Sequence, residues 1–76
     1  MPLGVPQLPI AASTGRTSDI TGLPGTTLRR LARTDPTFPR PFTINERGDL
    51  RWPVREVVGW LEGRAGRPLL AVPLAA

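Results

Sequence analysis

The stretch TGLPGTTLRRLART, residues 21–34, decides the fold that we expect for this chain. When Pro24–Thr34 is placed on an α-helix, its apolar and polar residues separate onto two faces. The apolar face holds Pro24, Leu28, Leu31 and Ala32. The opposite face holds Thr26, Arg29, Arg30 and Arg33. We therefore predict a helix over Pro24–Thr34 that buries its leucines, exposes its arginines and begins with a proline, whose missing N–H is no loss in a first turn.

The residues before this helix predict a tight turn and a second, shorter helix. Gly22 can take the positive φ that a tight turn requires. Ahead of the turn we expect a short helix with Ser18 as its N-cap, Asp19 in its first turn and Ile20 pointing inward. The two helices and the turn between them form a helix-turn-helix arrangement.

The residues after the helix predict an extended connector and then a β-hairpin. The proline-rich connector, 35–41, cannot form a helix, and we expect Phe38 to enter the core midway along it. Residues 42–44 and 50–52 each alternate apolar and polar side chains, which is typical of half-buried strands. The residues between them, 45–49, are turn formers that close the hairpin.

A further periodic segment closes the domain. We predict a helix over Pro53–Glu62, with Gly63 as its C-cap. Trp52 and Trp60 are both expected at core positions. The elements follow the order of a helix-turn-helix, a hairpin and a closing helix. This order predicts a small α+β fold, mainly α, of the winged helix-turn-helix type, in which the hairpin is the wing.

Charge divides the chain into three parts. Residues 16–64 hold all but one of the charged side chains, and we assign the winged helix-turn-helix domain to them. Residues 1–15 carry no charged side chain and are rich in proline, and 65–76 carry only Arg67. We expect these two end segments to be tails.

The composition excludes most catalytic chemistry. The chain has no histidine, cysteine, lysine or tyrosine, which excludes the usual nucleophilic triads, Schiff bases, disulfides and Cys/His zinc sites. Glu46 and Asp49 share one loop and could hold a magnesium ion, but oxygen sites usually recruit more carboxylates, so a solvated loop is the simpler interpretation. We expect no enzymatic activity, no cofactor and no bound metal.

The charge balance favours a nucleic-acid partner. All ten basic residues are arginine, and the net charge is +4. In a helix-turn-helix the second helix enters the DNA major groove, where the fork of an arginine can bind guanine O6 and N7. We therefore predict base contacts from the arginine face of Pro24–Thr34, a minor-groove or backbone contact from Arg47 at the hairpin tip, and phosphate contacts from Arg40 and Arg51. The alternative is an ordinary solvated surface whose arginines reflect GC-rich coding.

Four short motifs occur in a characteristic order: TGLPGTTLRRL at 21–31, FPRP at 38–41, RW at 51–52 and EVVGWL at 56–61. Together they resemble the AlpA-type prophage regulators, which are small excisionase-like, MerR-like winged-helix proteins. The resemblance implies a DNA-binding regulator of a phage or mobile element, which acts on transcription or bends DNA for excision by an integrase. The residues that it implies for the major groove are Thr26, Thr27, Arg29 and Arg30, and for the wing Arg47.

A second class of function stays open, a protein-interaction module on the same scaffold, such as an anti-repressor or a phage-encoded inhibitor of a host protein. The concentration of charge on one helix and one hairpin tip favours DNA. Because one such domain reads few base pairs, we expect a homodimer or a cooperative array on double-stranded DNA, with an integrase or a host protein as further candidate partners. No apolar run has the length of a membrane span, and no segment has the composition of a secretory signal, so a cytoplasmic, nucleoid-associated location is expected.

Overall fold

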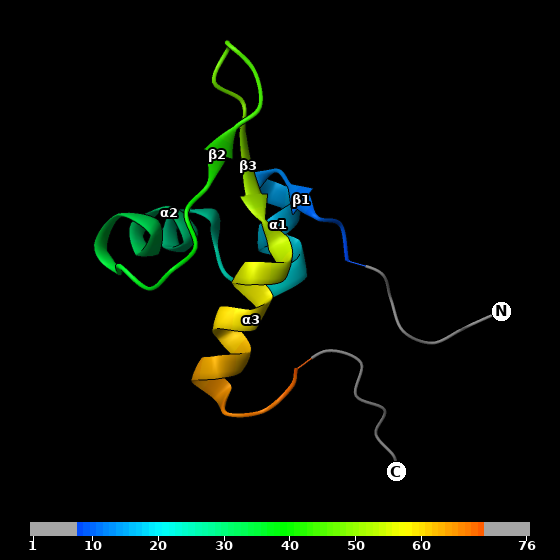
Figure 1. Ribbon diagram of the computed structural model, residues 1–76, viewed down its shortest axis with the longest axis vertical. Coiled ribbons are helices and arrows are strands. Elements are labelled where there is room, and N and C mark those ends of the chain that lie inside the picture. Colours follow the sequence, from blue (N-terminus) through cyan, green and yellow to red (C-terminus); the bar gives the residue numbers. More distant parts are fainter. Residues whose placement is uncertain (1–7, 70–76) are drawn as a thin grey trace, which may run out of the picture.

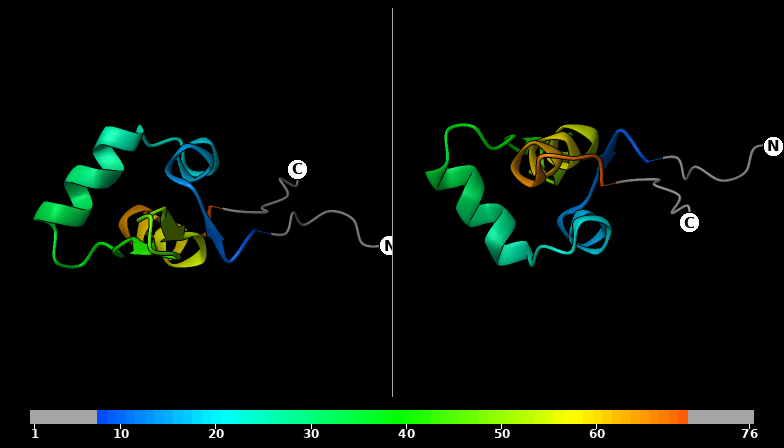
Figure 2. Two further views of the ribbon diagram at one scale, coloured as in Figure 1. Left: turned by 90° about the horizontal axis from the view of Figure 1, so that it is seen from above. Right: turned by 90° about the horizontal axis from the view of Figure 1, so that it is seen from below.

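The computed structural model describes residues 8–69, which form three helices and a three-stranded antiparallel sheet (Figure 1). In chain order the elements are β1 (Ala11–Ala12), α1 (Thr14–Thr21), α2 (Gly25–Thr34), β2 (Phe42–Thr43), β3 (Leu50–Pro53) and α3 (Val54–Ala65). The strand β3 leads directly into α3, and Figure 2, which looks along these two elements, shows α1 and α2 arranged around them. The predicted small α+β class is confirmed.

The sheet is built around β3, in the order β1-β3-β2. The predicted hairpin is confirmed, because β2 pairs with β3 and Phe42 lies opposite Arg51. The backbone N–H of Ile44 extends the hairpin by donating to the carbonyl of Asp49 at 3.1 Å. The expected half-burial of the first hairpin strand is wrong, because Phe42 and Ile44 are 44% and 52% exposed on the sheet edge.

The core consists of two adjoining apolar clusters. The larger cluster joins α2, the connector, β3 and α3 through Leu28, Ala32, Phe38, Trp52 and Val57. The smaller cluster joins β1 to α3 through Ala12, Val54 and Val58. Ile20 packs against this second cluster, so its predicted inward position is confirmed. The two clusters leave the outer face of α2 to solvent.

Phe38 lies between the two tryptophans, as an aromatic wedge from the connector. Its ring meets Trp52 at 6.2 Å and Trp60 at 4.8 Å between centroids, edge-on in both cases. The predicted burial of Phe38 and Trp52 is confirmed. Trp60 packs against the larger core cluster but is only half-buried. Its indole N–H donates to Thr37 Oγ1 at 3.0 Å, and the Arg64 guanidinium lies over its ring.

The second helix forms where the alternation of leucines and arginines predicts it. Leu28 and Ala32 are buried, and Leu31 is half-buried against the core. The helix begins at Gly25, and Pro24 is its exposed N-cap residue rather than part of the apolar face. The turn before it depends on Gly22, which takes φ 78° and donates its N–H to the carbonyl of Ser18 at 2.8 Å.

The first helix starts earlier than predicted and packs through hydroxyl groups. Ser13, not Ser18, is its N-cap, and Ser13 Oγ accepts the N–H of Arg16 at 3.2 Å. Thr17 is its only fully buried residue, and Thr17 Oγ1 donates to the carbonyl of Ala12 at 3.4 Å. The indole N–H of Trp52 donates to Thr14 Oγ1 at 2.9 Å, which ties the start of the helix to the core.

Regular secondary structure extends beyond residues 16–64 at both ends. β1 and the start of α1 lie within the segment predicted as a tail, because Ala12 pairs with Trp52 in the sheet and is buried. At the other end α3 continues to Ala65 and is capped by Gly66, at φ 73°, rather than by Gly63. Residues 1–7 and 70–76 of the predicted tails lie outside the described residues.

Candidate nucleic-acid interface

The outer face of α2 carries three exposed arginines: Arg29, Arg30 and Arg33. They project away from the buried Leu28 and Ala32, because residues one or two positions from these core residues fall on the other side of a helix. Among residues 8–69, no carboxylate lies within ion-pairing distance of any of the three. The helix therefore presents a cluster of positive charge that no acidic side chain neutralises.

The beginning of α2 has free backbone donors as well as polar side chains. Thr26 is exposed and Thr27 is half-buried. The first amides of an α-helix have no intrahelical partner, and the N-cap residue, Pro24, offers no side-chain acceptor for them. At Gly25, a Cβ atom would come within 3.2 Å of Thr14 Cγ2, so this end of α2 is packed closely against the start of α1.

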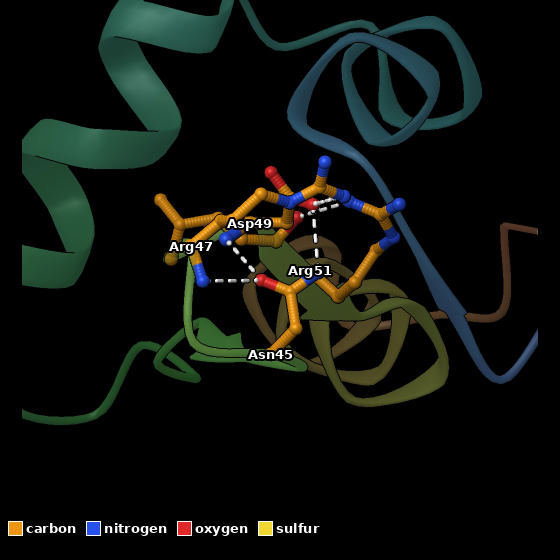
Figure 3. A network of polar contacts seen from close by, with 5 residues as sticks. Asn45, Arg47, Asp49 and Arg51 are labelled. Carbon is orange, nitrogen blue, oxygen red and sulfur yellow. Dashed lines mark hydrogen bonds and ion pairs between the residues drawn. The ribbon is translucent and has the colours of Figure 1, made fainter.

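The hairpin loop is an ordered network of polar contacts that projects beyond the helices (Figures 1 and 3). Asn45 Oδ1 accepts the backbone N–H groups of Arg47 and Asp49, at 3.0 and 3.3 Å. Asn45 Nδ2 donates to Asp49 Oδ2 at 2.8 Å. Gly48 takes φ 86° at the tip. These bonds fix the direction in which Arg47 leaves the loop.

Arg47 is exposed at the hairpin tip but is not a free charge. Its Nη2 lies 3.0 Å from Asp49 Oδ2, and its side chain is 81% exposed. Arg47 and Asp49 are two residues apart in the sequence, and Gly48 between them takes a positive φ in the turn. The same contact engages Oδ2 of Asp49, one of the two carboxylates that share this loop.

Arg40 and Arg51 lie in different surroundings. Arg40 is exposed in the connector, between two prolines. Arg51 is half-buried on β3, and its Nη1 donates to the carbonyl of Leu50 at 2.8 Å. Arg51 and Arg16 of α1 line the same cavity. Arg16 is not among the site residues predicted from the sequence, because it lies at the edge of a predicted tail. The signal that could have found it is Ser13, a favoured N-cap residue three positions earlier.

The acidic residue next to α2 is held away from the arginine face. Asp35 follows the last turn of the helix, and its carboxylate accepts the hydroxyl and the backbone N–H of Thr37, at 2.7 and 2.9 Å. These two hydrogen bonds lower the pKa of Asp35 below its usual 3.8, and the nearby Arg64 guanidinium, 3.5 Å away, acts in the same direction. Asp35 thus joins the end of α2 to α3, and its charge is paired with Arg64.

Comparison of the chain with known protein families, with curated proteins and with solved structures found no match. The evidence for function is therefore the distribution of charge over the fold. Within residues 8–69, no helix is both long enough and apolar enough to cross a membrane. The candidate residues fall into four groups: the outer face of α2, Arg40 of the connector, the hairpin loop, and the cavity between α1 and β3.

Proposed function

We propose that the protein binds double-stranded DNA in a sequence-specific manner, with α2 as the recognition helix of a winged helix-turn-helix. The observation that carries the proposal is the row of three arginines on the outer face of α2, which has no acidic partner in residues 8–69. An ordinary solvated helix usually mixes charges of both signs on its outer face. A face of one sign, opposite a buried apolar face, fits a polyanionic partner.

The proposed mechanism combines phosphate neutralisation with reading of base edges. Arg29 and Arg30 are proposed to contact guanines in the major groove, where a bidentate contact contributes about 1–3 kcal/mol of discrimination. Thr26, Thr27 and Arg33 extend this surface along α2. The hairpin loop would act as the wing, with Arg47 on the adjacent minor groove or backbone, and Arg40 and Arg51 on phosphates.

The resemblance of four short motifs to the AlpA-type regulators supports a phage or mobile element as the setting of the proposed binding. On that basis the protein regulates transcription or bends DNA for excision, with an integrase as a partner in the second case. A single helix of this length reads few base pairs, so we propose a homodimer or a cooperative array on repeated sites. The proposed mechanism uses no cofactor and involves no catalysis.

Fluorescence anisotropy with labelled duplexes tests the proposal. Duplexes tiled from the DNA beside the protein's own gene are compared with a scrambled duplex at two salt concentrations. We expect one fragment to bind about a hundredfold tighter or more than the scrambled duplex. The Arg29→Gln, Arg30→Gln double variant should lose most of this ratio, whereas Arg67→Gln, in the segment after α3, should keep it. An unchanged ratio in the double variant would refute α2 as the recognition helix.

The exposed apolar side chains of β2 favour the second candidate function, a protein-interaction module. Phe42 lies in the edge strand β2 and Ile44 directly follows this strand, and an edge strand can pair with another chain. Equal and weak binding to every duplex would favour this function over the first. In that case Phe42→Ser should abolish capture of the partner protein, while the α2 variants should leave it unchanged.

A further inference from the structure

A cavity of about 290 Å³ lies where β1, the first turn of α1 and β3 meet. Its wall is formed by Pro9, Ala11, Ala12, Ser13, Arg16 and Arg51. Two of these six residues are arginines, and none is acidic. The cavity lies outside the arginine face of α2.

The two arginines reach the cavity from different elements. Arg16 comes from the first turn of α1, and Arg51 comes from the middle of β3. In the part of the chain between residues 8 and 69, neither lies within ion-pairing distance of a carboxylate. Two positive charges at one cavity repel each other, and an anion bound between them would remove this repulsion.

The polar groups at the cavity suit a tetrahedral oxyanion. Arg51 is half-buried, and its hydrogen bond from Nη1 to the Leu50 carbonyl, 2.8 Å long, restrains the guanidinium. A guanidinium offers several N–H donors in a planar fork that matches phosphate oxygens. Ser13 Oγ already accepts the N–H of Arg16, so its own O–H remains as a donor. Two arginines and one serine thus line the same cavity.

The cavity also lies between the two surfaces that we propose to contact DNA. Thr14, which follows Ser13, packs against the first residue of α2, Gly25. Arg51 lies on the strand that leads away from the hairpin loop, four residues after Arg47. A bound phosphate would therefore lie between the start of α2 and the wing.

We propose that this cavity binds a phosphate group of the DNA backbone, with Arg16 and Arg51 as its cationic contacts. The inference rests on the proposed function for the source of the phosphate, but the anion site itself does not depend on it. Binding here would anchor the duplex beside the start of α2 without reading its sequence.

Two measurements on the full chain test the proposal. In the first, inorganic phosphate is titrated into the ¹⁵N-labelled protein at constant ionic strength, with chloride as the reference, and amide shifts are followed by NMR. We expect saturable shifts of the Ser13 and Arg16 amides and of the Arg51 side-chain Nε–H. The Arg16→Gln, Arg51→Gln double variant should lose the Ser13 shift, and Arg67→Gln should keep all three.

In the second measurement, duplex affinity is followed against salt concentration for the same variants. Loss of one phosphate contact should lower the slope of log K against log salt by about 0.9. The ratio between the specific and the scrambled duplex should stay unchanged, because a backbone contact carries no sequence information. Circular dichroism checks that each variant is folded, and if the double variant is not, either single variant replaces it.

The outcomes separate this proposal from the proposed function. Phosphate shifts together with a lowered salt slope support the DNA backbone as the source. Phosphate shifts with an unchanged slope, or with no DNA binding by the parent protein, would overturn the DNA source and leave a free phosphate or a phosphorylated small molecule as the ligand. The absence of phosphate shifts together with an unchanged slope would overturn the site, even if α2 binds DNA as proposed.

Discussion

The position of Phe38 between two tryptophans predicts a measurable loss of stability when the ring is replaced by leucine. Phe38 is only 1% exposed, and its ring meets Trp52 and Trp60 edge-on. Each edge-to-face pair contributes about 0.5–1.5 kcal/mol beyond area burial. Leucine keeps much of the apolar volume but loses both pairs, so Phe38→Leu should lower the free energy of unfolding by about 1–3 kcal/mol. This is a large part of the roughly 5 kcal/mol that holds a small domain together.

Urea unfolding followed by far-ultraviolet circular dichroism measures this loss. Phe42→Leu is the matched control, because it makes the same chemical change at a side chain that is 44% exposed. We expect the control to change the free energy of unfolding by no more than about 0.5 kcal/mol. Equal losses in the two variants would refute the aromatic packing around Phe38.

Three further predictions concern single contacts. Thr14→Val removes the acceptor of the buried Trp52 indole N–H, so urea unfolding should show a loss of about 1–3 kcal/mol, and an unchanged midpoint would contradict that hydrogen bond. The pKa of Asp35 is lowered in the folded protein, so its carboxylate stabilises the fold above pH about 3.8, and this contribution is lost as the pH falls. In Asp35→Asn the fall in Tm between about pH 5 and pH 2 should therefore be smaller than in the parent protein. An equal fall in the two proteins would contradict a stabilising role of the Asp35 carboxylate. If the wing contacts DNA, Asp49→Asn should strengthen binding to every duplex and Arg47→Gln should weaken it, and equal affinities would argue against a wing contact.

The sequence predicts those parts of the fold in which side-chain polarity follows a regular period. Leu28 and Ala32 identify the buried face of α2, because they recur at the helical period. The hairpin follows from alternating strands around a segment of turn formers. Phe38 is predicted to be buried because it is the one aromatic residue in a proline-rich connector. For α2 and Phe38 the local pattern and the tertiary packing agree, whereas in the hairpin the alternation predicts the pairing but not the exposure of Phe42 and Ile44.

The sequence does not predict the elements whose packing depends on distant partners. The two alanines of β1 carry no strand pattern, and their strand exists because Ala11 and Ala12 meet Pro53 and Trp52 across the sheet. The first helix has no apolar period either, because Thr17 rather than a leucine is its fully buried residue. The sequence predicts that the α2 arginines share one exposed helix face. It does not predict that Arg16 and Arg51 line one cavity, because they are far apart in the chain and meet only in the folded protein.

The polar anchoring of α1 has a consequence for the order in which the domain opens. A helix held by threonine hydroxyls exposes little hydrocarbon when it detaches, so its local opening free energy should lie well below that of the element pair β3 and α3. Amide hydrogen exchange would then be faster in Thr14–Thr21 than around Trp52 and Val57. The arginine-bearing α2 is held differently, because its Leu28 and Ala32 belong to the same core cluster as Phe38 and Trp52. The support that α1 gives to α2 should therefore be lost before the core that holds α2 opens.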